Sequence, residues 1–140
     1  HSRGVWVFLL HNKAQVKATL RSFVKMVERQ FQKNIKIVRS DNGTEFTCLT
    51  SEFSEQGIRH QTSCVGTPQQ NGRVERKHRH ILNVARALLF QSCLPVKFWG
   101  ESILTAAYLI NRTPSRLLKG KSPYELIHGA PPSYDNLRVF

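Results

Sequence analysis

Two carboxylates in this sequence are candidates for chemistry because of where each one falls along the chain. Asp41 follows an apolar segment, residues 35–39, that has the pattern of a buried strand. Glu75 follows a polar, glycine-bearing loop and lies near the start of a helical pattern, with 33 residues, 42–74, between the two acids. Carboxylate oxygens are the hard ligands that suit Mg²⁺ or Mn²⁺. Together the two acids predict a site for a divalent ion.

Each acid also has an ordinary structural explanation when it is considered alone. Residues 40–43, SDNG, have the composition of a type I or type I′ turn. Glu75 would interact favourably with the dipole of a helix that begins nearby, and Arg79 lies four residues later, where it could form an ion pair. Two readings of Glu75 therefore stay open: it anchors its basic neighbours, or it holds a metal ion.

The segment around Glu75 is strongly basic. Its candidate phosphate-binding side chains are Arg73, Arg76, Lys77 and Arg79. An ordinary solvated helix face is the alternative, but the whole chain has 21 Lys and Arg against 9 Asp and Glu, a net charge of +12. This excess favours a polyanionic partner, nucleic acid before an anionic membrane surface. No apolar run is long enough to cross a membrane, so we expect none.

The remaining pattern alternates strands and helices, which is typical of the α/β class. Residues 4–10, GVWVFLL, predict a buried strand, a second strand is expected at 35–39 and a weaker one at 59–63. Helices are expected at 16–31, 51–56, 72–91, 95–113 and 124–128. Three cysteines, an odd number at spacings that match no zinc motif, predict reduced and buried thiols.

Four stretches resemble one known family, and the resemblance spans essentially the whole chain. They are RSDNGTEF, GIRHQTSCVGTPQQNGRVERKHRHILNVARALL, LPVKFWGESILTAAYLINRTPS and SPYELIHGAPPSYDNLRVF. They resemble the integrase core of copia-type LTR retrotransposons, plant lineages in particular, within the retroviral integrase superfamily. TPQQNG followed by ERKHR is the specific part of the match, whereas SDNG alone is not. The resemblance implies an RNase H-like fold and a DDE polynucleotidyl transferase.

The resemblance also implies roles for individual residues. Asp41 matches the second catalytic Asp of the family and Glu75 matches the catalytic Glu, and both would bind Mg²⁺ or Mn²⁺, with two ions in the intact enzyme. The active-site loop that meets DNA is matched by Gln69, Gln70 and Asn71. Arg79 occupies a helix position that holds a DNA-contacting base in relatives. The parent protein would insert element DNA into target DNA by 3′-processing and strand transfer.

The chain departs from the family at its start. The family's first catalytic Asp lies on a strand upstream of the segment that begins at His1, so the resemblance implies a core that lacks its first two sheet strands. We expect residues 1–115 to be a partial integrase catalytic core and residues 116–140 to be an extension. A fragment with two of three acids should be inactive, or nearly so, alone. The alternative is a non-catalytic nucleic-acid-binding remnant.

The same resemblance implies partners and a location for the intact protein. Its partners would be the DNA ends of the element and the target DNA, and no membrane is expected among them. The intact protein would act as a homo-oligomer. The expected location is the nucleus, reached from a cytoplasmic particle.

Overall fold

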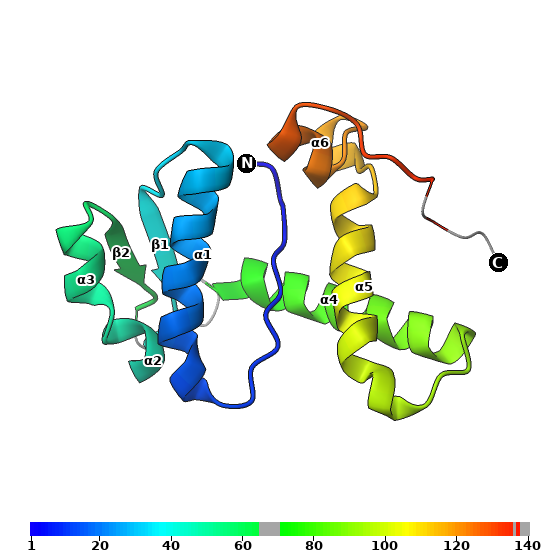
Figure 1. Cartoon of the computed structure of the whole chain (residues 1–140), viewed down its shortest axis with the longest axis horizontal. Helices are drawn as coiled ribbons and strands as arrows, with labels where there is room; N and C mark the ends of the chain where they lie inside the picture. The colour runs from blue at the N-terminus through cyan, green and yellow to red at the C-terminus, as the bar shows by residue number, and fades with distance from the viewer. Residues whose placement is uncertain (65–70, 136, 138–140) are drawn as a thin grey trace. The chain divides into compact units, whose positions relative to one another are not determined.

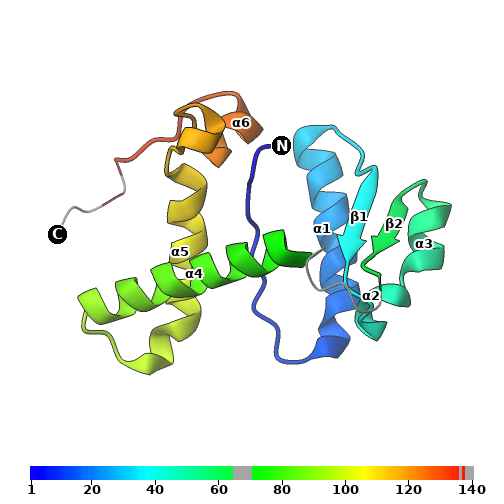
Figure 2. The same ribbon diagram turned by 180° about the vertical axis from the view of Figure 1, so that it is seen from behind.

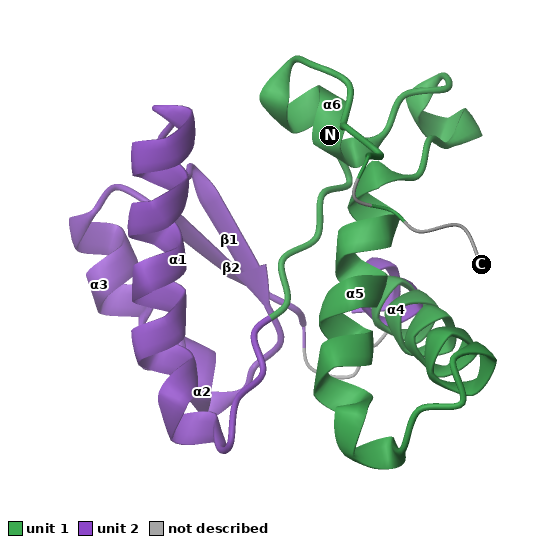
Figure 3. Cartoon of the chain, turned by 45° about the vertical axis from the view of Figure 1, so that its right-hand side comes forward, with its two compact units in different colours: residues 1–7, 77–140 green, residues 8–76 purple. Residues whose placement is uncertain are grey.

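The chain, in a computed structural model that describes residues 1–64, 71–135 and 137, divides into two compact units. We call residues 8–76 the acid-bearing unit, and residues 1–7 with 77–140 the helical unit (Figure 3). The described helices are all too short or too polar to span a membrane.

The acid-bearing unit is a small sheet with helices packed against it (Figures 1 and 2). Its elements are a 3₁₀ turn (Lys13–Gln15), α1 (Val16–Phe31), β1 (Ile37–Ser40), α2 (Thr44–Thr47), α3 (Thr50–Glu55) and β2 (Arg59–Thr62). The two strands are parallel, with Ile37 opposite Arg59 and Ser40 opposite Thr62. Because parallel strands point the same way, β1 and β2 end at the same edge of the sheet. The α/β class predicted from the sequence is confirmed.

The core of the acid-bearing unit joins α1, α3 and the sheet. Its buried cluster consists of Val24, Leu49, Phe53 and Ile58, each no more than 3% exposed. The apolar spacing of α1 brings Val24 to this cluster, and the predicted helix at 16–31 is confirmed. Gly57 ends the short helix before β2 with a φ of +71°, a conformation that glycine adopts without strain.

The helical unit is built on two crossing helices. Its elements are α4 (Gly72–Gln91, in this unit from Lys77 onward), a 3₁₀ turn (Val96–Phe98), α5 (Trp99–Arg112), a second 3₁₀ turn (Arg116–Leu118) and α6 (Pro123–His128). Figure 2 shows α4 and α5 crossing. Ile81 and Ala85 of α4 form one buried cluster with Ala106 and Ile110 of α5. Both alanines are 0% exposed, and their small side chains let the two helix backbones approach closely.

The short helix predicted at 124–128 is present as α6. The backbone N–H of Glu125 donates to Ser122 Oγ at 3.1 Å, which caps the start of the helix. Gly129 ends it with a φ of +76°. The guanidinium of Arg112 lies 3.5 Å from the ring centroid of Tyr108 and 4.8 Å from that of Tyr124, which ties α5 to α6.

The strand predicted at residues 4–10 is wrong. This segment has no regular secondary structure, and Trp6 and Phe8 are 42% and 49% exposed. A strand needs a neighbour for its backbone groups, and within the described residues β1 and β2 pair only with each other. The backbone of Val5 instead bonds to the side-chain amide of Asn111, which accepts at 2.8 Å and donates at 2.7 Å. The single side-chain amide of Asn111 pairs with the backbone of one residue only, so it does not replace the neighbouring strand that residues 4–10 would need.

The cysteine prediction is also wrong about burial. Cys48, Cys64 and Cys93 are all exposed. Each lies just beyond the end of a helix or strand, and none belongs to either buried cluster.

Candidate metal and nucleic-acid site

Asp41 lies directly after β1, and local hydrogen bonds orient it. The backbone N–H of Gly43 donates to Asp41 Oδ1 at 3.0 Å, and the Ser40 hydroxyl donates to the Asp41 carbonyl oxygen at 2.7 Å. These hydrogen bonds form a tight local structure at residues 40–43, in agreement with the turn predicted there. It does not argue against a metal role, because it fixes one carboxylate oxygen at the edge where the strands end.

Gly43 leaves room for two carboxylates. A Cβ atom at this position would lie 3.0 Å from Asp41 Oδ1 and 2.9 Å from Glu45 Oε2, so any side chain would displace them. Glu45 forms an ion pair with Lys13 at 3.3 Å. A hydrogen bond to its own backbone amide, and next Lys13, hold the pKa of Glu45 below its usual range. Glu45 therefore belongs to the contact between α2 and the turn before α1.

His60 on β2 supports the same turn and is not among the site residues predicted from the sequence. Its Nε2 lies 2.9 Å from Ser40 Oγ and its Nδ1 lies 2.8 Å from Thr50 Oγ1. Since the Ser40 hydroxyl donates to Asp41, it accepts from Nε2–H, and Nδ1 pairs with the Thr50 hydroxyl. The ring also packs edge-on against Phe53 at 5.4 Å. A polar residue in a weak strand is the signal that could have found it.

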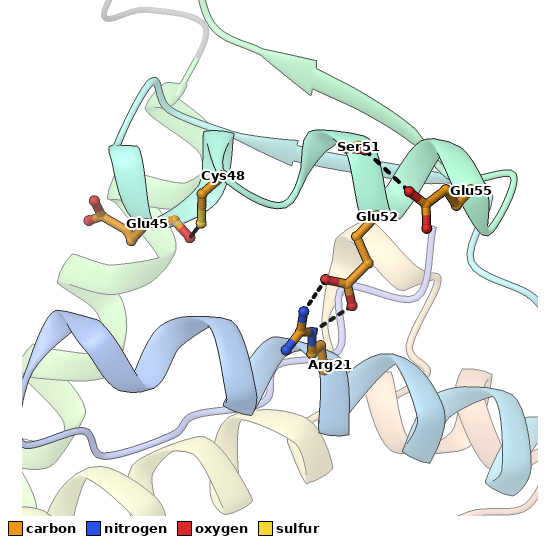
Figure 4. A network of polar contacts seen from close by, with 6 residues as sticks. All are labelled: Arg21, Glu45, Cys48, Ser51, Glu52 and Glu55. Atoms are coloured by element: carbon orange, nitrogen blue, oxygen red, sulfur yellow. Dashed lines mark hydrogen bonds and ion pairs between the residues drawn. The ribbon is translucent and has the colours of Figure 1, made fainter.

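One ion pair connects α1 to α3. The Arg21 guanidinium donates twice to the Glu52 carboxylate of α3, at 2.6 and 2.5 Å (Figure 4). This two-point contact lowers the pKa of Glu52 and raises that of Arg21. Both side chains are partly exposed, so the pair fixes the geometry of α1 against α3 more than it adds stability.

Glu75 lies in the first turn of α4 and is exposed. Asp41 and Glu75 both line one open hollow of about 1180 Å³ within the acid-bearing unit. The ion pairs found among the described residues do not include one between Glu75 and Arg79. The structure thus brings the two acids to one hollow and gives no support to the anchoring interpretation of Glu75.

The hollow is basic as well as acidic. Arg39 from β1 and Arg73 and Arg76 from the start of α4 line it beside the two carboxylates. Arg39 donates to the side chain of Gln61 at 2.7 Å, which holds it over the sheet. Bases grouped around two acids suit a ligand that brings both a cation and phosphate groups.

The other predicted DNA-binding residues are placed differently. Asn71 lines the hollow, whereas Gln69 and Gln70 lie outside the described residues. Arg79 is exposed on α4, in the part that belongs to the helical unit. Lys77 is half-buried there, and burial, followed by the nearby charge of Arg3, lowers its pKa.

The donor set fits a divalent ion but is small. Two carboxylates that line one hollow are the oxygen ligands that Mg²⁺ and Mn²⁺ prefer. Among residues 1–64, 71–135 and 137, no three His, Cys, Asp or Glu side chains are grouped so that they could hold a metal. Asp41 and Glu75 would therefore supply only part of a metal site.

Comparisons with known proteins place this arrangement in context. No family model matches the chain. It is 44% identical over 139 residues to the retrovirus-related Pol polyprotein from transposon RE1 of Arabidopsis thaliana, a match that covers 99% of this chain and 10% of that protein. It is 43% identical over 141 residues to the Pol polyprotein from transposon TNT 1-94 of Nicotiana tabacum, covering 99% and 11%. The chain thus spans about a tenth of the length of these curated relatives.

A solved structure shows the same fold. The HTLV-2 integrase catalytic core domain, in complex with magnesium and in a trimeric form, superposes with a TM-score of 0.65 at 22% identity. The match covers 91% of this chain and 78% of that domain. The RNase H-like fold of an integrase core, predicted from the sequence, is confirmed as the fold class. By sequence the chain is similar to one segment of the retrovirus-related Pol polyproteins of plant transposons, and its fold is that of the retroviral integrase catalytic core.

Proposed function

We propose that this chain is part of a retrotransposon integrase, a DDE-type polynucleotidyl transferase that inserts element DNA into target DNA. One observation supports the proposal above all: Asp41 and Glu75, with 33 residues between them, line the same hollow. Their types and positions match the second and third acids of the family's site. The segment similarity to Pol polyproteins of transposons supports the same conclusion.

The acidic and basic residues of the hollow would have different roles. Asp41 and Glu75 would hold Mg²⁺ or Mn²⁺, and such an ion, when bound, neutralises charge on the phosphate that reacts. Arg73 and Arg76 would attract the DNA backbone, and the exposed Arg79 would extend the contact along α4. The acids of the intact enzyme would hold two ions, and a third carboxylate would come from a strand upstream of this chain. Alone, the chain should be inactive or nearly so.

Metal binding tests the site in the chain itself. We expect Mn²⁺ to bind, as measured by the loss of the free-ion signal in electron paramagnetic resonance. Asp41→Asn and Glu75→Gln should each weaken binding, because each removes one of two charged ligands. Glu55→Gln, which changes an exposed acid of α3 that lies outside the hollow, is the matched control. Equal Mn²⁺ affinity in all four proteins would reject the site.

Activity tests the proposed reaction in the intact enzyme. A longer protein that includes the upstream strands should transfer a DNA end to target DNA in Mg²⁺ or Mn²⁺, and Asp41→Asn or Glu75→Gln should abolish the transfer. Unchanged strand transfer in either variant would show that these acids are not catalytic. DNA partners, assembly as a homo-oligomer and a nuclear location belong to the same proposal for the intact protein.

A second candidate is a nucleic-acid-binding remnant without chemistry. It is favoured by the small acid set among the described residues and by the exposed Arg73, Arg76 and Arg79 on α4. This candidate predicts DNA binding that needs no metal and weakens steeply with salt. Replacing Arg76 and Arg79 with Ala should reduce the slope of log affinity against log salt by about 0.9 for each phosphate that is no longer neutralised. Arg116→Ala, at an exposed base of the helical unit outside α4, is the control.

A further inference from the structure

Two asparagines connect the turn that contains Asp41 to the start of the helix that contains Glu75, and both bond to the same serine. Asn42 Nδ2 donates to the carbonyl oxygen of Ser63 at 2.8 Å. Asn71 Nδ2 donates to the Ser63 hydroxyl at 3.3 Å. Ser63 therefore lies between the two acid-bearing segments, and it bonds to one through its backbone and to the other through its side chain.

The bridge is attached to the end of the sheet. The backbone N–H of Ser63 donates to the carbonyl oxygen of Ser40 at 3.1 Å, which extends the parallel pairing by one residue beyond β2. Ser63 is therefore fixed against the last residue of β1, immediately before Asp41. Its position is set by the sheet, so the groups that bond to it are positioned relative to the sheet as well.

The two ends of the bridge lie next to the acids along the chain. Asn42 is the neighbour of Asp41, and Asn71 precedes Glu75 by four residues, about one helical turn. Asp41, Ser63, Asn71 and Glu75 all line the hollow. A movement at either asparagine would therefore move a carboxylate.

We infer that Ser63, through Asn42 and Asn71, is a positioning residue that sets the separation of Asp41 and Glu75, so that both carboxylates bind one divalent ion. This inference rests on the proposed metal site and assigns no catalytic role to Ser63. Without the bridge, two like charges that share a hollow would be free to move apart, because they repel each other. With the bridge, the two carboxylates are already held near each other, so binding of the ion costs less conformational entropy.

The experiment separates positioning from a general role in folding. Mn²⁺ is titrated into the 140-residue chain, and free Mn²⁺ is measured by electron paramagnetic resonance. Ser63→Ala removes the hydroxyl that accepts from Asn71 and should weaken Mn²⁺ binding about tenfold, the lower end for groups that support metal ligands. Ser63→Thr keeps the hydroxyl and should restore wild-type affinity. Ser51→Ala, which removes an exposed hydroxyl that bonds to Glu55 outside the hollow, should leave affinity unchanged.

Asn71→Ala removes the same hydrogen bond from its other end, so it must weaken Mn²⁺ binding as much as Ser63→Ala does. The far-ultraviolet circular dichroism of each variant shows that it is folded at the temperature of the titration. If Ser63→Ala alone is unfolded, Asn71→Ala decides the question. Wild-type affinity in a folded Ser63→Ala or Asn71→Ala variant would overturn the inference, and leave the proposed metal site intact.

A double-mutant cycle gives the decisive result. In the Glu75→Gln background only Asp41 remains as a charged ligand. The separation of two carboxylates then no longer affects binding, so Ser63→Ala should leave Mn²⁺ affinity unchanged. An equal loss of affinity in both backgrounds would show a merely structural role for Ser63 and would overturn the inference. If Asp41→Asn and Glu75→Gln do not change the affinity of the wild-type chain, the proposed metal site fails, and the positioning role fails with it.

Discussion

The acid-bearing unit and the helical unit each contain a core cluster of four buried side chains among the described residues, but the clusters differ in kind. In the acid-bearing unit all four are large, and they include Leu49 and Phe53. In the helical unit two of the four are Ala85 and Ala106, whose small size lets two helices cross. The first cluster is therefore sensitive to a decrease in side-chain volume and the second to an increase.

The polar interactions of the two units differ as well. In the helical unit, Asn111 binds the backbone of Val5 and Arg112 stacks on tyrosines, and neither interaction reaches an acid of the proposed site. In the acid-bearing unit, His60 and Ser63 bond to the residues on either side of Asp41. Function in this molecule should therefore depend on hydrogen bonds at the end of the sheet, whereas the helical unit depends on close packing.

The largest expected effect comes from volume changes in the two clusters. Leu49→Ala should cost about 2–5 kcal/mol of unfolding free energy, because a fully buried side chain leaves a cavity. Ala106→Leu should cost about 1–3 kcal/mol, because the helix crossing has no room for it. Amide hydrogen exchange should show the first destabilisation mainly in α1, β1 and β2, and the second mainly in α4 and α5.

A substitution outside both clusters supplies the control. Thr105→Ala, at an exposed position of α5, should change stability by less than about 0.5 kcal/mol. If Leu49→Ala and Ala106→Leu were to accelerate exchange equally in every element, the two clusters would be one cooperative core and the comparison would be wrong.

The sequence predicts those parts of the molecule that depend on local pattern. The helices α1 and α4 are predictable because their apolar residues recur at helical spacing, and α6 because a serine, a proline and a glycine mark its ends. Asp41 and Glu75 stand out by their places at the end of a strand and at the start of a helix. The structure shows that both line one hollow.

What the sequence does not predict depends on distant partners. Residues 4–10 have a strand composition, but a strand also needs a neighbouring backbone, and composition does not show whether one is present. His60 and Ser63 are missed because nothing in their own segment shows that Ser40, Thr50, Asn42 and Asn71 will be their partners. The domain boundary expected at residue 115 stays a prediction.

His60 offers a smaller, local test of the polar interactions. His60→Phe keeps an aromatic ring against Phe53 but removes the hydrogen bonds to Ser40 and Thr50. At about 0.5–1.5 kcal/mol for each bond, the unfolding free energy should fall by roughly 1–3 kcal/mol in urea titrations. Thr50→Val, which removes one of the two bonds, should lower the unfolding free energy about half as much. Unchanged stability in His60→Phe would mean that ring packing, not hydrogen bonding, holds this position.

The smallest effect is the pH dependence of the interaction between α1 and α3. Arg21 lowers the pKa of Glu52 below the usual glutamate value of 4.5 in the folded chain. A lowered carboxyl pKa gives a stabilisation that is fully present above the unfolded pKa and is lost as pH falls through the folded pKa. The difference in urea midpoint between wild type and Glu52→Gln should therefore be constant from pH 7 to about pH 5 and then shrink toward pH 3. The pKa of Glu45 is lowered as well and would add its own dependence on pH, so both proteins are compared in a Glu45→Gln background. A difference that persists unchanged at pH 3 would show that Glu52 acts through packing of its uncharged form. The ion pair drawn in Figure 4 would then have no part in fixing α1 against α3.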